Sequence, residues 1–287
     1  MLTEVKKISP AKINLYLEVQ GKTDDGYHEL ESLMTFCDIG DVIHIKKSNS
    51  FSLKLSGPFS KDLKVQNNII IKAVNLAETI LNKKINVRIN LIKNLPISSG
   101  MGGGSSNAAT TILCLNEIYK FPKIENFNNL LFSLGADVPF CFSRKTSLVS
   151  GKGQILKKVD KIPEFLVLLV NPLIEVSTQR IFSRLKKTKN KKLEYDENAM
   201  KSDNILIFLN QKKNDLEEQA KLICKNISQI LDYLKIETNS KLTRMTGSGA
   251  TCFAIYDNVK DLNNAESLMK KKFKNFWVKK TKICNKI

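Results

Sequence analysis

The chain has 287 residues, a length that suits two domains, each with its own hydrophobic core. It contains no run of eighteen apolar residues, which excludes a transmembrane helix, and its first residues lack the apolar core of a signal peptide. We therefore expect a cytoplasmic protein. The formal net charge of +18 would suit nucleic-acid binding, but the excess is mostly lysine spread along the chain. The densest run, Lys186–Lys192, contains no aromatic residue, so we favour a general attraction for polyphosphate substrates over specific binding of nucleic acid.

The cysteines are scattered, form no CxxC pair, and are accompanied by only two histidines, so we expect no structural zinc site. We interpret most of them as small core residues in a reducing compartment. They are Cys37, Cys114, Cys141, Cys224, Cys252 and Cys284.

The first predicted element is a strand over Lys12–Gln20, in which apolar and polar residues alternate. The alternation places Lys12 and Asn14 on the same side of the strand. The two side chains belong either to a functional site or to an ordinary solvent-exposed face, and the stretch alone favours neither.

A turn is predicted at Asp24–His28, because Asp and Gly favour turns. Tyr27 and His28 then lie in or just after a loop, where an aromatic ring beside an imidazole could stack on a flat base and bind its edge. The alternative is a tyrosine packed on the core and a histidine in solvent. The next predicted elements are strands over Asp41–Lys47 and Phe51–Leu55 and a helix over Ile69–Leu81, capped by Asn67 or Asn68.

A strand over Ile85–Leu91 leads into a glycine-rich loop and then into a helix that ends near Tyr119. Glycine lets backbone N–H groups approach a ligand closely, and a helix start adds unpaired donors and the positive end of the helix dipole. The arrangement predicts a phosphate site rather than a simple reversal of the chain. It is not a Walker A loop, and the motifs of protein kinases are absent.

A helix over Ile124–Leu134 is predicted to end at Gly135, which is followed at once by Asp137. A single carboxylate among apolar residues is hard to explain as a surface charge. It is either a functional group or the cap of a helix or turn.

The second half of the chain repeats the alternation of strands and helices, and Thr246–Ala250 forms a second glycine loop or a plain turn. The domain boundary is predicted between Gly153 and Pro163. The remaining predicted elements are strands over Phe165–Val170, Thr251–Tyr256 and Phe276–Ile283, and helices over Thr178–Leu185, Asp203–Asn210, Asn214–Leu234 and Val259–Phe273.

Five motifs occur along the chain in a fixed order, and together they resemble the GHMP kinases, a superfamily that includes homoserine, mevalonate and galactose kinases. They are PAKINL at 10–15, GYH at 26–28, the PxxxGxGGGSSNA loop at 96–108, GADVP at 135–139 and TGSGA at 246–250. The resemblance implies an α+β fold in two domains. Residues 1–155 would form an ATP-binding domain similar to domain 2 of ribosomal protein S5, and residues 156–287 a ferredoxin-like domain.

The resemblance also implies a reaction in which the γ-phosphoryl of ATP, bound with Mg²⁺, passes to an alcohol. Asp137 would accept the proton of the hydroxyl, and Lys12 would offset charge on the transferring phosphoryl. Residues matching the nucleotide site are Asn68, Lys93, Pro96, Ser99, Gly100, Met101, Gly102, Gly103, Gly104, Ser105, Ser106, Gly247, Ser248 and Gly249. Residues matching the acceptor site are Asn14, Tyr27, His28, Thr178 and Phe182.

The combined motifs are most similar to the GHMP kinases of the non-mevalonate isoprenoid pathway. This implies ATP and CDP-methylerythritol as small-molecule substrates, with phosphorylation at the C2 hydroxyl, and no specific nucleic-acid or membrane partner. Two alternatives remain open: a GHMP kinase that acts on another alcohol or on a phosphate, and a basic nucleic-acid-binding protein of the same ancestry.

Overall fold

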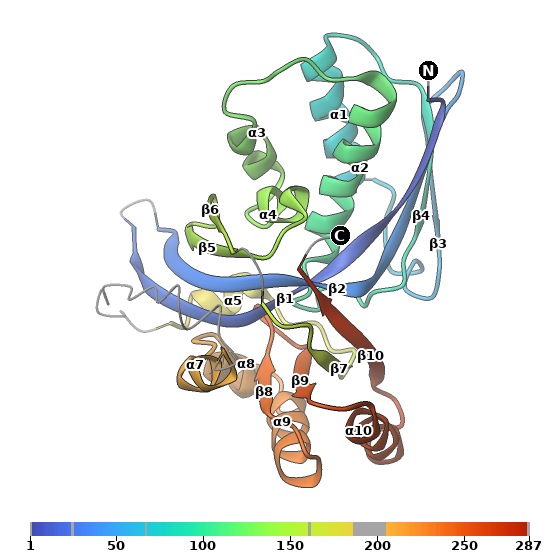
Figure 1. Ribbon diagram of the computed structural model, residues 1–287. Coiled ribbons are helices and arrows are strands. Elements are labelled where there is room, and N and C mark those ends of the chain that lie inside the picture. Colours follow the sequence, from blue (N-terminus) through green and yellow to red (C-terminus); the bar gives the residue numbers. More distant parts are fainter. Residues whose placement is uncertain (1, 24–25, 67, 160–161, 186–204, 286–287) are drawn as a thin grey trace. The chain divides into compact units, whose positions relative to one another are not determined.

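The computed structural model of the chain describes all residues except 1, 24–25, 67, 160–161, 186–204 and 286–287, and divides into two compact units (Figure 1). Unit 1 comprises residues 1–11, 39–97 and 102–144, and unit 2 comprises residues 12–38, 98–101 and 145–287. Several predictions therefore lie outside the described residues. These are the tip of the turn at Asp24 and Asp25, the cap at Asn67, the lysine run at Lys186–Lys192 and the start of the helix at Asp203.

The first two strands are much longer than the sequence predicted. Strand β1 spans Glu4–Lys22 and strand β2 spans His28–Lys47. Each strand begins in one unit and continues into the other, since residues 12 and 39 are the points at which the chain changes unit. The predicted part of β1, Lys12–Gln20, alternates in sequence yet is buried on both faces, including the polar residues Lys12 and Asn14.

The sheet of unit 1 is formed by parts of β1 and β2 with β3 (Ser52–Ser56) and β4 (Val87–Ile92). β2 and β4 are antiparallel, with His44 opposite Asn90, while β3 runs parallel to β4. The inward residues of β4 alternate as Val87, Ile89 and Leu91, all of them buried.

Four helices complete unit 1, and two of them, α1 (Ile69–Leu81) and α2 (Gly103–Tyr119), pack against each other. α1 has the bounds that its sequence pattern predicts. Asn68 caps it by accepting a hydrogen bond from the backbone N–H of Ile70 at 3.0 Å. Figure 1 shows α2 beside α1 and the shorter helices α3 (Phe127–Leu134) and α4 (Val138–Ser143) next to them.

Unit 2 contains an antiparallel sheet in the order β10–β7–β9–β8, whose strands span Trp277–Cys284, Leu166–Asn171, Cys252–Tyr256 and Leu242–Met245. β10 also pairs with β2, through Ile283 and Cys37. The strands β5 (Ser147–Gly151) and β6 (Ile155–Lys158) form a hairpin, and β5 pairs with β2, with Val149 opposite Ser32. The strands β5, β6 and β8 were not predicted from the sequence.

Among the described residues, unit 2 contains the helices α5 (Thr178–Phe182), α7 (Ile205–Gln211), α8 (Glu217–Ile223), α9 (Asn226–Glu237) and α10 (Val259–Lys272). The prediction of a single helix over Asn214–Leu234 was wrong, because the chain leaves helical geometry at Cys224 (φ −132°, ψ 95°). Asn214 is not helical either. Its side-chain amide donates to the carbonyls of Met245 and Gly247.

The core of unit 2 lies between its sheet and its helices, where Leu168, Ile227, Ile230 and Ala265 are fully buried. Five of the six cysteines are buried and none forms a disulfide, which confirms their interpretation as core residues. The predicted domain boundary near residue 155 remains a prediction, since the compact units interleave along the chain rather than meeting at one point.

Candidate functional site

The first part of the glycine-rich loop is held rigidly within unit 2. The backbone N–H of Thr251 donates to the carbonyl of Ser99 at 3.2 Å, and that of Lys12 donates to the carbonyl of Met101 at 3.0 Å. Between them Gly100 has a φ of +75°, and a Cβ at this position would collide with the carbonyl oxygen of Thr246. Only glycine therefore fits here.

The second part of the loop starts helix α2 in unit 1. Gly102 is the N-cap residue in the left-handed conformation (φ 62°), no side chain caps the helix, and its first turn carries no acidic residue. The first N–H groups of the helix thus lack a side-chain acceptor, and a Cβ added at Gly104 would meet no atom within 4 Å. A helix start with open space beside it is suited to bind an anion.

Lys93 lies just past the end of β4 and is buried with Asp41 of β2 as an ion pair. The other carboxylate oxygen of Asp41 accepts hydrogen bonds from the backbone N–H groups of Asn94 and Leu95, at 2.7 and 2.9 Å. A Cβ at Gly103 would lie 2.9 Å from Nζ of Lys93. The ammonium group of Lys93 therefore lies next to Gly103, the first residue of α2.

In unit 2, Lys12 and Asn14 form a buried polar cluster with Thr246. Nζ of Lys12 donates to Oδ1 of Asn14 at 2.7 Å, and the backbone N–H of Asn14 donates to the hydroxyl of Thr246 at 2.8 Å. The side-chain amide of Asn14 also donates to the hydroxyl of Ser32. The predicted pairing of Lys12 and Asn14 on one side of the strand is confirmed, and the cluster fixes both side chains.

The second glycine loop adjoins this cluster. A Cβ at Gly247 would lie 3.3 Å from Nζ of Lys12 and 2.7 Å from the carbonyl oxygen of Gly100. The hydroxyl of Ser248 is hydrogen-bonded to that of Thr178 at 2.6 Å. Within unit 2, the predicted nucleotide-binding segments at Gly100 and Gly247–Gly249 therefore lie together, and Thr178, which was predicted for the site of the phosphoryl acceptor, contacts the second of them.

The aromatic residues that were predicted to hold a base also belong to unit 2. The rings of His28 and Phe182 are 5.1 Å apart at an interplanar angle of 36°. Tyr27 is 59% exposed, and Nζ of Lys152 lies 5.1 Å from the centre of its ring. The alternative interpretation, in which Tyr27 packs on the core, is therefore wrong. Burial, and then the charge of Lys22, lowers the pKa of His28, which favours the neutral imidazole.

Asp137 occupies the N-cap position of α4 in unit 1 and is partly buried. Its side chain makes no capping hydrogen bond to the helix, so the explanation of this carboxylate as a helix cap is not supported. The short helix nevertheless fixes the direction of the backbone that carries the carboxylate.

Other predicted residues have structural partners. The side chain of Asn68 is occupied in capping α1. The hydroxyl of Ser9 donates a hydrogen bond to Oδ1 of Asn107 at 2.7 Å and lies 3.0 Å from the hydroxyl of Ser106. Pro96 is buried at the entrance of the loop. Whether these residues contact a ligand stays a prediction.

Sequence reasoning missed Asp41, Ser32 and the side chain of Thr246. Asp41 was placed in a strand, but nothing in its neighbourhood indicates that it meets Lys93 more than fifty residues later. Thr246 was named as part of a loop, without a role for its hydroxyl. A buried acid can be inferred only when its partner is known.

The described residues contain no group of three or more His, Cys, Asp and Glu side chains that could hold a metal ion. Magnesium retains several waters and is commonly bound through substrate phosphates and one or two carboxylates. The described residues therefore fit a Mg²⁺ ion that arrives with a nucleotide rather than one held in a dedicated cage of side chains.

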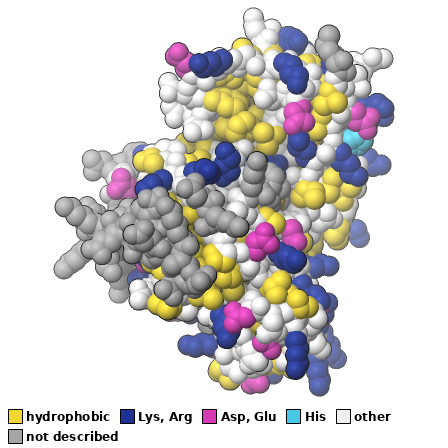
Figure 2. All heavy atoms as spheres, viewed as in Figure 1, with side chains coloured by type: hydrophobic (Ala, Val, Ile, Leu, Met, Phe, Trp, Pro, Cys, Tyr) yellow, Lys and Arg dark blue, Asp and Glu magenta, His cyan; other side chains and the backbone are white. Residues whose placement is uncertain are grey.

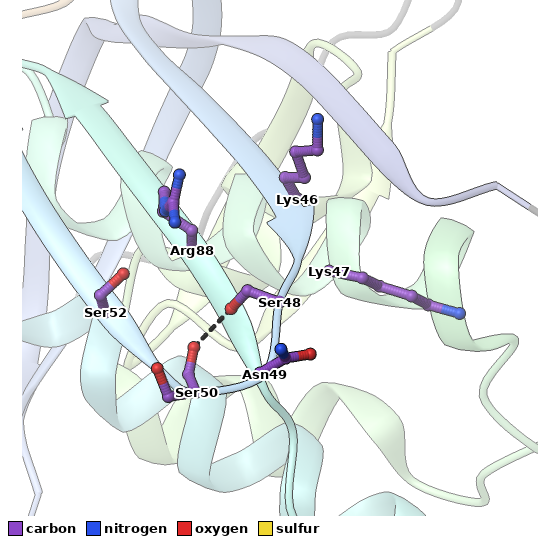
Figure 3. A pocket seen from close by; sticks show the side chains of 7 residues that line it. All are labelled: Lys46, Lys47, Ser48, Asn49, Ser50, Ser52 and Arg88. Carbon is purple, nitrogen blue, oxygen red and sulfur yellow. Dashed lines mark hydrogen bonds between the residues drawn. The ribbon is translucent and has the colours of Figure 1, made fainter.

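A hollow of about 360 Å³ lies at the other end of the unit 1 strands (Figure 3). It is lined by Lys46, Lys47, Ser48, Asn49, Ser50, Ser52 and Arg88. Arg88 stands near the start of β4, whereas Lys93 follows its end, a separation of about 16 Å along an extended strand. No predicted site residue lines this hollow.

On the face of the molecule in Figure 2, Lys and Arg side chains are scattered among acidic and apolar ones rather than gathered into one patch. This distribution agrees with a lysine excess that is spread along the chain. Among the described helices, none is both long and apolar enough to span a bilayer.

Comparison with known proteins defines the class. Residues 68–145 match the family model of the GHMP kinases N terminal domain, and residues 197–275 match that of the GHMP kinases C terminal domain. A crystal structure of a 4-(cytidine 5'-diphospho)-2C-methyl-D-erythritol kinase is similar with a TM-score of 0.77 at 24% identity, covering 97% of this chain and 99% of that one. A homoserine kinase from Cytophaga hutchinsonii is similar with a TM-score of 0.72 at 14% identity, covering 100% and 96%. The fold is that of a GHMP kinase.

Relatives with higher sequence identity define the family more narrowly. The 4-diphosphocytidyl-2-C-methyl-D-erythritol kinase of Agrobacterium fabrum is 37% identical over 94% of this chain and 93% of its own length. The enzyme of the same name from Paracoccus denitrificans is 36% identical over 95% and 94%. The chain therefore belongs to the family of 4-diphosphocytidyl-2-C-methyl-D-erythritol kinases, within the GHMP kinases.

Proposed function

We propose that the chain transfers the γ-phosphoryl group of ATP to the C2 hydroxyl of CDP-methylerythritol, giving the 2-phosphate and ADP in the non-mevalonate isoprenoid pathway. The observation that carries this proposal is the similarity to kinases named for this substrate, which extends over more than nine-tenths of the chain. The site geometry within each unit agrees with it.

The chemical step needs a group that takes the proton of the attacking hydroxyl, and we assign this role to Asp137. The carboxylate stands at the start of α4 and is not used to cap that helix. Lys12 would stabilise the negative charge that develops on the transferring phosphoryl. Its ammonium group is oriented by Asn14, which is itself held by Thr246 and Ser32. Most of the rate enhancement would come from positioning and electrostatics, as in other phosphoryl transfers.

The nucleotide would bind through its phosphates to the glycine-rich loop. The start of α2 offers N–H groups without a side-chain cap, and the loop before it is fixed by backbone hydrogen bonds to Lys12 and Thr251. Gly247–Gly249 would contact the same phosphates, and Asn68 would lie near the adenosine. Bound Mg²⁺ would neutralise part of the phosphate charge.

The cytidine end of the acceptor would bind at His28, Tyr27 and Phe182. His28 and Phe182 already face each other, and Tyr27 presents an exposed ring on which a pyrimidine can stack. The lowered pKa of His28 keeps the ring neutral near pH 7, so that it can accept one hydrogen bond and donate another.

The test is to incubate the purified chain with ATP, Mg²⁺ and CDP-methylerythritol and to follow the products by phosphorus NMR. We expect ADP and a new phosphomonoester on the methylerythritol. Homoserine and mevalonate serve as competing acceptors, and preferential phosphorylation of either would overturn the substrate assignment.

The first prediction concerns the base. Asp137→Ala should lower kcat by about 10²- to 10⁴-fold, the usual contribution of a general base, with little change in ATP affinity. Asp62→Ala, which removes an exposed carboxylate of unit 1, is the control and should leave kcat unchanged. Turnover by Asp137→Ala close to that of the native chain would exclude this residue as the base.

A further inference from the structure

The side chains of Asp41 and Lys93 form an ion pair in the interior of unit 1. These side chains are 0% and 5% exposed, whereas those of a surface pair such as Lys7 and Glu117 are 34% and 43% exposed. Burying two charges has a large desolvation cost, and apolar residues of similar volume often stabilise a fold equally well. Stability alone therefore does not explain why this pair is present.

The position of the pair suggests what it does. Asp41 receives three donors from consecutive residues: the ammonium of Lys93 and the backbone N–H groups of Asn94 and Leu95. These residues lead directly into Pro96 and the glycine-rich loop. One carboxylate thus fixes both the Lys93 side chain and the path of the chain into the loop.

Lys93 is in turn directed at the start of α2. Its Nζ lies 2.9 Å from the place of a Gly103 Cβ, whereas the nearer carboxylate oxygen of Asp41 lies 3.8 Å from that place. The ammonium group of Lys93 therefore lies closer to this position at the start of α2 than the carboxylate of Asp41 does. A cation beside uncapped N–H groups raises the positive potential there, which is unfavourable unless an anion binds.

We infer that Asp41 is a positioning residue for the nucleotide phosphates: it holds the Lys93 ammonium behind the start of α2, where the ammonium attracts phosphate. This inference rests on the proposed function, because it takes the loop to be a nucleotide site. It assigns the Lys93 side chain to the phosphate end of the nucleotide, while the adenosine end is left to other groups.

The test is the effect of Asp41→Asn on the dissociation constants of ATP, ADP and adenosine, measured by calorimetry. Asparagine keeps the shape of the side chain but no longer holds the ammonium by charge, so Lys93 loses its fixed position. We expect ATP and ADP to bind about tenfold more weakly, the effect of a single charge-assisted hydrogen bond, with adenosine affinity and the KM of the acceptor unchanged. Lys93→Met should give the same pattern.

The direction of the change in ATP affinity distinguishes a positioning role of Asp41 from the effect of its negative charge alone. If Asp41 acted only as a negative charge near the phosphates, its removal would strengthen ATP binding, and that result would overturn the inference, as would unchanged affinity. Equal losses for ATP and adenosine would show a merely structural role and would also overturn it. Glu117→Gln is the matched control, because it removes one negative charge from an exposed ion pair on α2 itself and should change none of these constants.

A second variant covers the case in which Asp41→Asn does not fold because an uncompensated ammonium is left buried. The double variant Asp41→Leu with Lys93→Met removes both charges and is expected to fold. It should still bind ATP more weakly than the native chain, with adenosine unaffected, and native ATP affinity in this variant would refute the inference. Failure of the native chain to bind ATP would instead refute the proposed function.

Discussion

His28 shows how its surroundings set the chemistry of one side chain. Burial, assisted by the charge of Lys22, lowers its pKa below the ordinary value of 6.5. The ring therefore stays neutral under conditions in which an exposed histidine begins to take up a proton. A neutral ring beside Phe182 carries one hydrogen-bond donor and one acceptor, as the proposed binding of a cytosine base requires.

We expect kcat/KM for the proposed cytidine substrate to decrease with falling pH at a lower pH than a histidine with the ordinary pKa would give. The sign follows from the lowered pKa, since protonation of His28 is delayed to more acidic solution. Proton NMR of the imidazole checks the titration directly. The chain has only one other histidine, so His44→Asn assigns the two signals. A midpoint above 6.5 for His28 would contradict the prediction.

Single residues also mark the limit of what the sequence could predict. The glycine-rich loop, Lys12 and Asp137 stand in recognisable local motifs and could be named. The partner of Lys93 could not be, because Asp41 and Lys93 are 52 positions apart and only the pairing of β2 with β4 brings them together. Contacts of this kind depend on register, which a local pattern does not contain.

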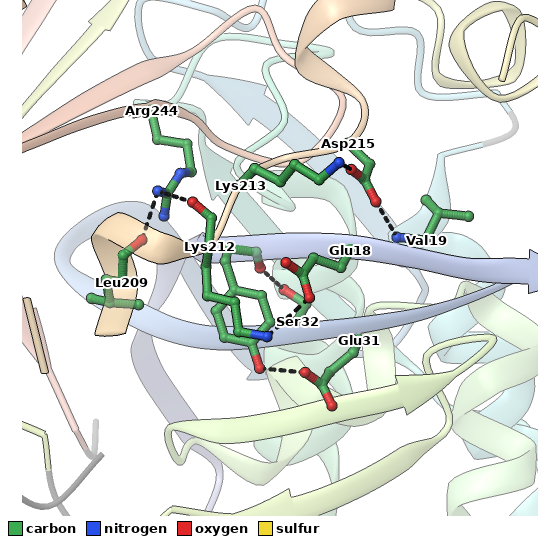
Figure 4. Close-up of polar contacts among 10 residues, drawn as sticks. Glu18, Val19, Glu31, Ser32, Leu209, Lys212, Lys213, Asp215 and Arg244 are labelled. Atoms are coloured by element: carbon green, nitrogen blue, oxygen red, sulfur yellow. Dashed lines mark hydrogen bonds and ion pairs between the residues drawn. The ribbon is translucent and has the colours of Figure 1, made fainter. Parts of the chain in front are cut away.

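At the scale of elements, one arginine holds together segments that are distant in sequence (Figure 4). Arg244 of β8 is buried and donates hydrogen bonds to the carbonyls of Leu15 in β1, Leu209 in α7 and Lys212 just after that helix. Burial lowers its pKa to about 10, so the guanidinium remains charged at neutral pH. The end of α7 is thereby fixed to the middle of β1.

We expect Arg244→Met to lower the free energy of unfolding by about 3 kcal/mol, because buried carbonyl groups lose their donor. Urea unfolding followed by circular dichroism measures the change. Arg88→Met removes an arginine from the exposed face of β4 and should change stability by less than about 0.5 kcal/mol. Equal effects of the two variants would show that the carbonyl contacts of Arg244 contribute little.

Helices and strands were predictable in proportion to the regularity of their patterns. α1 was found with its true bounds because its apolar spacing and its cap residue agree. The helix over Asn214–Leu234 was wrong because apolar spacing continues across the break at Cys224 and hides it. The strand β8 was missed because it is only four residues long and contains the buried Arg244, which reads as polar.

At the scale of the whole molecule, stability should depend on the ionisation of Glu31. This carboxyl is buried, and one of its oxygens accepts a hydrogen bond from the hydroxyl of Tyr16, while the other has no hydrogen-bond partner among the described residues (Figure 4). Burial raises its pKa above the ordinary value, and the hydrogen bond from Tyr16 opposes the shift only in part.

In the folded chain Glu31 therefore retains a proton that it releases at lower pH in the unfolded chain. The free energy of unfolding consequently falls as the pH rises above about 4.5. We expect Glu31→Gln, which cannot ionise, to gain stability relative to the native chain as pH increases from 4 to 8. Thermal unfolding across this range provides the measurement. Glu29→Gln, at an exposed position of the same strand, should show no such trend. A pH-independent difference for Glu31→Gln would count against the prediction.

The course of β1 and β2 has a consequence for how the protein is made. Residues 12–38 belong to unit 2, yet they leave the ribosome long before residues 145–287, which complete that unit. During synthesis the apolar side chains of Leu17 and Val19, which are buried in the core of unit 2 with Leu168 and later residues, remain without these partners. The nascent chain should therefore depend on chaperones that shield such segments, and a ribosome stalled near residue 150 should hold a chain that has not yet acquired a stable second unit.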